Sequence, residues 1–245
     1  MFEIIIKYIL LFFIYAFIGW CIEVFCKILE ERKFINRGFL IGPILPIYGF
    51  GVLLILASIK PDDNVFIVLL KSVLICSILE YFTSWVMEKF FKTRWWDYSR
   101  RRFNINGRIC LNTMIPFAIL GLLVVYVLNP FFTFIIDHSS MISNTIFASI
   151  FMIILIIDFC VTLKVLVKIK RKIKTSAKDN TEKIRDKISR WMERNSYFSK
   201  RLKRSFPDLD IRGKIEYVEN GIVKTVLIVN DSVVDLTAKL KKKRK

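Results

Sequence analysis

Residues 4–26 read IIIKYILLFFIYAFIGWCIEVFC, an apolar run in which only Lys7 and Glu23 carry charge. A helix rises about 1.5 Å per residue, so this run can cross the hydrocarbon core of a bilayer, which is roughly 30 Å thick. A signal peptide is the alternative interpretation. However, the run is too long for one, follows Glu3 rather than a basic segment, and has no small-residue cleavage site. We therefore interpret it as a transmembrane span.

Four similar runs follow, and together they predict an all-α integral membrane bundle of about five transmembrane helices. The chain has 245 residues, of which 54% are hydrophobic and 22 are Phe, too many apolar side chains for the interior of one soluble domain. Buried helices of a soluble protein are thus the weaker alternative. The predicted spans are Ile4–Cys26, Phe39–Ile59, Val65–Phe90, Leu111–Ile136 and Asn144–Val167.

Charge divides the chain into regions. The net charge is +18, and most of it lies after residue 163. We expect a transmembrane domain over residues 1–167, a basic juxtamembrane linker with an amphipathic helix over 168–205, and a small β-hairpin region with a Lys/Arg tail over 206–245. The amphipathic helix is predicted from Asp179 onward by an apolar stripe that includes Trp191. The hairpin is predicted by the turn signal Asn220-Gly221, with a third strand over Val233–Thr237.

The basic residues of the short loops predict the orientation. The first and third loops are rich in Lys and Arg, whereas the second has one Lys and two acids and the fourth has neither Lys nor Arg. Because Lys and Arg are retained on the cytoplasmic side, these two loops and the C-terminus are expected inside and the N-terminus outside. The basic run Lys168–Lys174 should attract anionic lipid headgroups, at about 1 kcal/mol per basic residue near the surface.

Acidic residues inside the spans are the first candidates for function. A charge near the bilayer centre costs roughly 2.5–3.5 kcal/mol on insertion scales, so it usually faces a cavity or a partner. Glu23, Glu80, Glu88 and Asp158 lie in such positions. The structural alternative for each is a carboxylate that a neighbouring helix satisfies or that reaches the headgroups.

The second span is unusual because its first half contains two prolines and several glycines. The sequence there is GPILPIYGFG, residues 42–51. Each proline removes a backbone donor and disturbs the preceding turn, and the freed polar groups need protein or water nearby. Such a broken helix can line a binding cavity. A kink packed against neighbouring helices is an equal alternative.

The third loop adds aromatic and charged residues in the order Arg94-Trp-Trp-Asp-Tyr98, with Arg108 at the start of span four. Aromatic residues at a membrane edge often serve only as an anchoring belt. Here, however, polar residues from distant stretches are expected to gather on the cytoplasmic side. The predicted substrate-binding residues are Glu23, Arg37, Tyr48, Glu80, Trp85, Glu88, Trp96, Asp97 and Arg108.

Several of these residues belong to an ordered set of motifs. The motifs are Gly19-Trp-x-x-Glu23, Asn36-Arg-Gly38, Gly42-Pro-x-x-Pro-Ile-Tyr-Gly-x-Gly51, Glu80-Tyr-x-x-Ser-Trp-x-x-Glu88, Trp95-Trp-Asp-Tyr98 and Gly107-Arg-Ile-Cys-Leu111. Over roughly residues 10–130 the chain resembles a bacterial family of multi-pass membrane proteins labelled ABC-transporter permease, type IV. The resemblance implies solute transport with a separate ATPase subunit. The tail lies outside it.

Two classes of function remain open from the sequence. The first is a permease-like transport component with a cytoplasm-facing polar cavity. The second is a membrane enzyme acting on a lipid or lipid-linked substrate at the inner leaflet, with Glu80 or Asp97 as acid or base. The chain has neither a P-loop nor a nucleophile next to a histidine, which favours transport.

Cofactors and partners are predicted from the same residues. The five cysteines and the single His138 have no metal-site spacing, so we expect no metal and no cofactor. The expected partners are the lipid bilayer, with anionic lipids at the basic tail, and either a separate ATPase subunit or further copies of the chain. Nucleic acid is the weaker alternative for the tail, because the tail is held beside the membrane.

Overall fold

The structure is a computed structural model of the whole chain. It describes residues 1–91, 93–176, 190–194, 197–205, 210–211, 213–219, 222–229 and 232–235. The chain forms two compact units. The first comprises Met1–Thr83 and Tyr98–Cys160, and the second comprises Ser84–Asp97 and Val161–Lys245.

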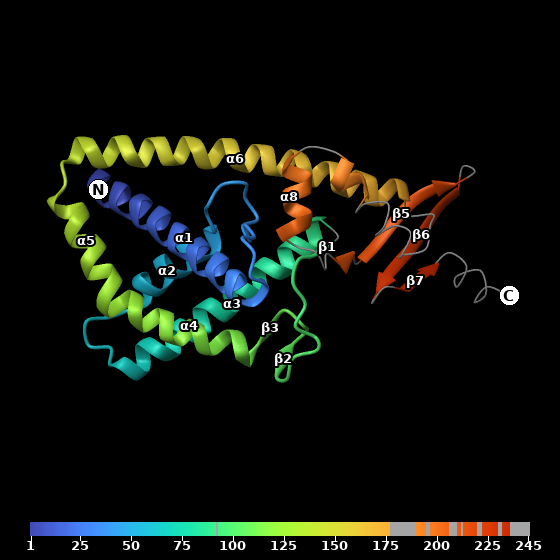
Figure 1. Cartoon of the computed structure of the whole chain (residues 1–245). Helices are drawn as coiled ribbons and strands as arrows, with labels where there is room; N and C mark the ends of the chain where they lie inside the picture. The colour runs from blue at the N-terminus through green and yellow to red at the C-terminus, as the bar shows by residue number, and fades with distance from the viewer. Residues whose placement is uncertain are drawn as a thin grey trace. The chain divides into compact units, whose positions relative to one another are not determined.

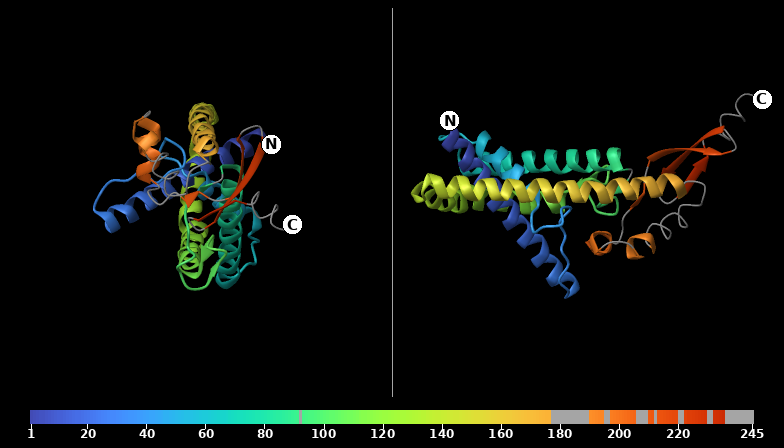
Figure 2. Two further views of the ribbon diagram at one scale, coloured as in Figure 1. Left: turned by 90° about the vertical axis from the view of Figure 1, so that its right-hand side faces the viewer. Right: turned by 90° about the horizontal axis from the view of Figure 1, so that it is seen from above.

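Four stretches of helix among the described residues are long and apolar enough to cross a membrane. They are α1 (Phe2–Glu31), α3 (Val65–Phe91), the continuous stretch Leu111–His138, and α6 (Met141–Ser176), whose apolar part is Met141–Lys168. Figures 1 and 2 show α6 as one uninterrupted helix. The predicted helical membrane fold is therefore confirmed.

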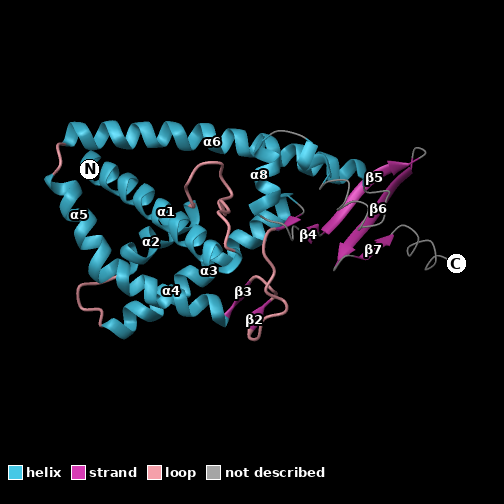
Figure 3. Ribbon diagram, in the orientation of Figure 1, coloured by secondary structure: helices cyan, strands magenta, loops and turns pink. Residues whose placement is uncertain are grey.

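The second predicted span is shorter than expected. Helix α2 covers only Pro46–Ser58, about 20 Å at the rise of an α-helix, and the prediction that this span begins at Phe39 is wrong. Figure 3 shows the chain between α1 and α2 as a loop. Pro43 and Pro46 explain the late start, because neither can donate a backbone hydrogen bond and Pro46 lies at the first helical position, where none is needed. We refer to residues 32–45 as the unwound segment.

The fourth span is helical throughout but irregular. It consists of α4 (Leu111–Leu123), the π-helical turn η1 (Val124–Leu128) and α5 (Asn129–His138). Pro130 has no N–H to donate to the carbonyl one turn earlier. Before it the helix widens to a π-turn, in which the Asn129 N–H donates to the carbonyl of Val124, five residues back.

Glycines allow close helix packing in the first unit. A Cβ at Gly19 of α1 would overlap the ring of Tyr48 in α2, and one at Gly49 would lie 2.6 Å from the ring of Phe12. A Cβ at Gly121 of α4 would likewise overlap Ser72 of α3. Small residues thus bring these backbones together, as is common between membrane helices. The buried core is formed by Ile6, Leu10, Leu11, Tyr15, Val52, Val124, Ile136 and Ala148.

The described part of the second unit contains α8 (Tyr197–Ser205) and an antiparallel sheet in the order β5-β6-β7. The strands are β5 (Gly213–Glu219), β6 (Ile222–Val229) and β7 (Ser232–Asp235), and the pair Glu219↔Ile222 flanks the predicted turn. The predicted hairpin is confirmed. Short strand β1 (Thr93–Arg94) pairs with β4 (Asp210–Ile211). The start of the predicted amphipathic helix, residues 179–189, and the final Lys/Arg run lie outside the described residues.

Candidate functional site

Asn36 organises the unwound segment. Its side-chain oxygen accepts hydrogen bonds from the indole N–H of Trp20, at 2.8 Å, and from the backbone N–H of Gly38, at 3.1 Å. Its side-chain nitrogen donates to the carbonyl of Ile41, at 3.2 Å. One amide therefore satisfies two backbone groups of a non-helical segment, the Gly38 N–H and the Ile41 carbonyl, and ties the segment to the Trp20 side chain of α1.

Asp158 of α6 holds the other end of the unwound segment. Its two carboxylate oxygens accept hydrogen bonds from the backbone N–H groups of Ile41, at 2.8 Å, and Gly42, at 2.7 Å. The side chain of Asp158 is buried. Two charge-assisted hydrogen bonds offset part of the cost of burying this carboxylate, and they connect segments more than 110 residues apart in the sequence.

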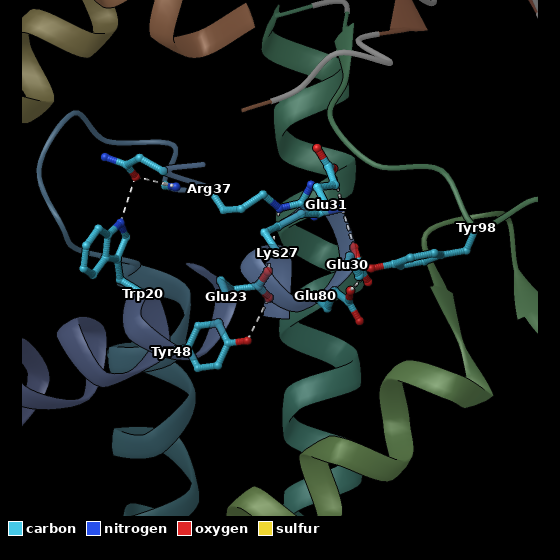
Figure 4. A network of polar contacts seen from close by, with 11 residues as sticks. Trp20, Glu23, Lys27, Glu30, Glu31, Arg37, Tyr48, Glu80 and Tyr98 are labelled. Atoms are coloured by element: carbon cyan, nitrogen blue, oxygen red, sulfur yellow. Dashed lines mark hydrogen bonds and ion pairs between the residues drawn. The ribbon is translucent and has the colours of Figure 1, made fainter. Parts of the chain in front are cut away.

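Glu23 connects α1 with α2 and the unwound segment (Figure 4). One of its oxygens accepts a hydrogen bond of 3.0 Å from the Tyr48 hydroxyl, and the other lies 3.8 Å from Nε of Arg37. That distance is too long for a hydrogen bond, so the Arg37 pair is an electrostatic contact only. Both side chains are about one-third exposed, which weakens the pair further.

Glu80 of α3 is 93% buried, since only 7% of its surface is exposed. Its Oε1 accepts a hydrogen bond of 3.3 Å from the Tyr98 hydroxyl. Its Oε2 is buried without a hydrogen-bond partner among the residues that the structure describes. Glu80 also lies close enough to Glu23 to feel its negative charge. Burying an acceptor without a donor costs free energy of folding, so native proteins keep such an atom only for a specific reason.

The loop before α4 positions Tyr98. Strands β2 (Asn104–Ile105) and β3 (Ile109–Cys110) form a tight hairpin, and the Tyr98 N–H donates to the Gly107 carbonyl at 2.8 Å. Gly107 has a positive φ of 66°, which favours glycine at this turn. Burial, followed by the nearby carboxylates, raises the pKa of Tyr98 above its usual value. The hydroxyl therefore remains a proton donor to Glu80.

Arg108 lies in the turn of the same hairpin, directly before β3, and is buried. Its guanidinium lies 5.5 Å from the centre of the Tyr81 ring, a cation–π contact, and the Tyr81 hydroxyl accepts a hydrogen bond from Asn106 at 2.9 Å. Arg108 thus fixes the hairpin to α3, one residue from Glu80.

A separate ion cluster lies in the second unit. Arg94, of which 7% of the side chain is exposed, donates to Glu88 at 3.0 Å and to Asp97 at 3.2 Å. Lys89 follows Glu88 in α3, and its ammonium lies 4.6 Å from the centre of the Trp85 ring; Trp96 is partly buried. A buried guanidinium that donates to two carboxylates is typical of a structural cluster.

The structure therefore divides the predicted site residues. Glu23, Arg37, Tyr48 and Glu80 lie together in the first unit, with Arg108 beside Tyr81, whereas Trp85, Glu88, Trp96 and Asp97 belong to the second unit. Their assignment to substrate binding remains a prediction. The sequence prediction names Asp158 among the acidic candidates for function, but it includes none of Asn36, Tyr98 and Asp158 among the substrate-binding residues.

Comparison with known proteins identifies the family. Neither the curated proteins nor the solved structures contain a match to this chain. The model of one protein family matches residues 10–163, which include all the residues of the first-unit cluster described above. With the membrane-length helices, this match places the chain among multi-pass membrane components of transporters. The chain belongs to the family described as Putative ABC-transporter type IV.

Proposed function

We propose that this chain forms the membrane path of a transporter and that its solute binds beside Glu80, between α1, α3 and the α2 end of the unwound segment. The observation that carries the proposal is the buried Glu80 carboxylate, whose Oε2 has no donor among the described residues although its other oxygen is held by Tyr98. A membrane protein that needed Glu80 only for stability would gain by pairing both oxygens.

The unwound segment supports a polar path. Non-helical backbone at membrane depth persists only where protein or water satisfies its polar groups. Here Asn36 and Asp158 supply those hydrogen bonds, so the segment is held in place without a helix of its own. Transporters place such broken helices at their binding sites because the exposed backbone offers donors and acceptors to a solute.

The proposed path opens to the cytoplasm. The basic residues of the first and third loops place the Glu23 end of α1 and the Tyr98 loop on that side, with the N-terminus outside and the C-terminus inside. The basic sequence Lys168–Lys174 after the last span supports binding to anionic headgroups. The match to a family of ABC-transporter type supports a separate ATPase subunit that supplies the energy.

The test is to purify the tagged full-length chain in mild detergent and to identify the proteins that accompany it. We expect an ATPase subunit in a fixed ratio and ATP hydrolysis by the complex. Glu80→Gln should keep the ATPase bound yet abolish transport in proteoliposomes, whereas Asp137→Asn, which alters an exposed acid paired with Lys7, should transport normally. A well-folded Glu80→Gln complex that transports at the normal rate would refute the role of Glu80.

A further inference from the structure

Among the described residues, no cation contacts the Glu80 carboxylate. The first-unit cluster brings two carboxylates, Glu23 and Glu80, near each other, and they face the hydroxyls of Tyr48 and Tyr98 (Figure 4). Arg37 lies 3.8 Å from Glu23. Lys27, also labelled in the figure, pairs with Glu30 at 2.5 Å and Glu31 at 3.1 Å. Glu80 itself is hydrogen-bonded to the hydroxyl of Tyr98.

The hydrogen bonds of the Glu80 carboxylate are also incomplete. Oε2 of Glu80 is an acceptor with no donor among the described residues, on a side chain that is 93% buried. An ionised carboxylate accepts several hydrogen bonds, so the missing partner is a donor, and a positively charged donor offsets the burial best.

Neighbouring groups narrow the kind of cation. The described residues contain no group of three or more His, Cys, Asp or Glu side chains that could hold a metal ion. The tyrosine hydroxyls, by contrast, donate to Glu23 and Glu80 and keep lone pairs that can accept N–H groups. Carboxylate and phenol oxygens beside aromatic rings are suited to an ammonium group, which has several N–H donors and is attracted to ring faces.

We propose that the solute of this site carries an ammonium group, which donates hydrogen bonds to Oε2 of Glu80 and is attracted by Glu23. This inference rests on the proposed transport function, since it names the class of solute bound at the same site. When the site is empty, Arg37 stabilises Glu23 electrostatically across the 3.8 Å between its Nε and the carboxylate.

The test uses the detergent-solubilised full-length chain and radiolabelled methylammonium, the smallest probe with both a positive charge and three N–H donors. We expect saturable binding that excess unlabelled methylammonium removes. Choline, a cation without N–H groups, should compete at least tenfold less well, and sodium chloride at the same ionic strength should not compete. Methylammonium should also raise the Tm of the chain in a dose-dependent way.

Variants separate binding from folding. Glu80→Gln keeps the shape of the side chain and should lose binding by at least tenfold while retaining its Tm without probe. Asp137→Asn is the control because it removes an exposed acid elsewhere and should bind as the unmodified chain does.

Several results would overturn the inference. They are no saturable binding to the folded chain, equal binding by Glu80→Gln, or equal competition by choline. A proton could also satisfy Oε2, and then pH alone would shift the Tm of the unmodified chain but not of Glu80→Gln, with no methylammonium binding. Neither experiment requires the ATPase. A chain that lacks methylammonium binding but still copurifies with an ATPase would therefore refute the solute class alone.

Discussion

The two ion clusters of this protein differ in the partners of their carboxylates. In the second unit, the buried Arg94 donates to the carboxylates of both Glu88 and Asp97, which are 21% and 30% exposed. In the first unit, the buried Glu80 accepts from the Tyr98 hydroxyl and lies near another acid, and its Oε2 has no donor among the described residues. A satisfied cluster stabilises the fold, whereas an unsatisfied one is kept for binding. Substitutions at Arg94, Asp158, the glycines of α2 and Glu80 can break or sharpen this contrast.

The largest effect is expected at Arg94. Arg94→Ala leaves Glu88 and Asp97 without their shared cation, and breaking a buried pair in this way costs about 3–5 kcal/mol. Because both acids are partly exposed, we expect the lower end of that range. Thermal unfolding of the purified chain in detergent would measure it. Arg100→Ala, at an exposed position of the same loop, should change the stability by less than about 0.5 kcal/mol. Equal effects of the two substitutions would show that the Arg94 cluster is not structural.

A smaller loss is expected at Asp158. Asp158→Asn keeps the shape of the side chain but turns an NH₂ group toward one of the two N–H groups of Ile41 and Gly42. Leaving one buried donor unpaired costs about 1–3 kcal/mol. Hydrogen exchange at these two amides should become faster, together with a lower Tm. Unchanged exchange would mean that Asp158 does not hold the unwound segment.

The glycines of α2 give a matched pair. Gly49→Ala places a Cβ 2.6 Å from the Phe12 ring and 2.7 Å from the Phe12 carbonyl oxygen, so α1 and α2 must separate. We expect a loss of about 1–3 kcal/mol. A Cβ added at Gly51 would lie 3.6 Å from its nearest neighbour, an atom of Leu79, which is an ordinary contact. Alanine also has a higher helix propensity than glycine, by up to about 1 kcal/mol. Gly51→Ala should therefore keep or raise the Tm, and a reversed order of the two variants would contradict the packing.

The smallest effect on stability is expected at Glu80. Glu80→Gln keeps the acceptor for Tyr98 and removes a charge that contacts no cation among the described residues, so the Tm should change by no more than a few degrees. Transport, by contrast, should be lost. A large drop in Tm would place Glu80 with Arg94 among the structural residues and would remove the contrast between the clusters.

The sequence predicts most residues of the two clusters but not their division. The sequence predicts a single cytoplasmic site for the motifs Glu80-Tyr-x-x-Ser-Trp-x-x-Glu88 and Trp95-Trp-Asp-Tyr98. The structure instead assigns Glu80 and Glu88, only two turns apart on α3, to different units with different partners. Sequence spacing gives the face of α3 on which each residue lies. It does not give the segment that packs against that face, so the partners of Glu80 and Glu88 could not be predicted.

The sequence by itself determined which stretches form membrane-length helices. Four predicted spans became membrane-length helices because the transfer of an apolar run into lipid depends on that run alone. The interruption of the second span was also encoded locally, by Pro43 and Pro46. Only the tertiary structure decided which groups satisfy the buried polar atoms. Asp158 meets Ile41 and Gly42, and Glu23 meets Tyr48, across long stretches of chain. Such pairings follow from helix packing, in which glycines at positions 19 and 49 bring α1 and α2 together.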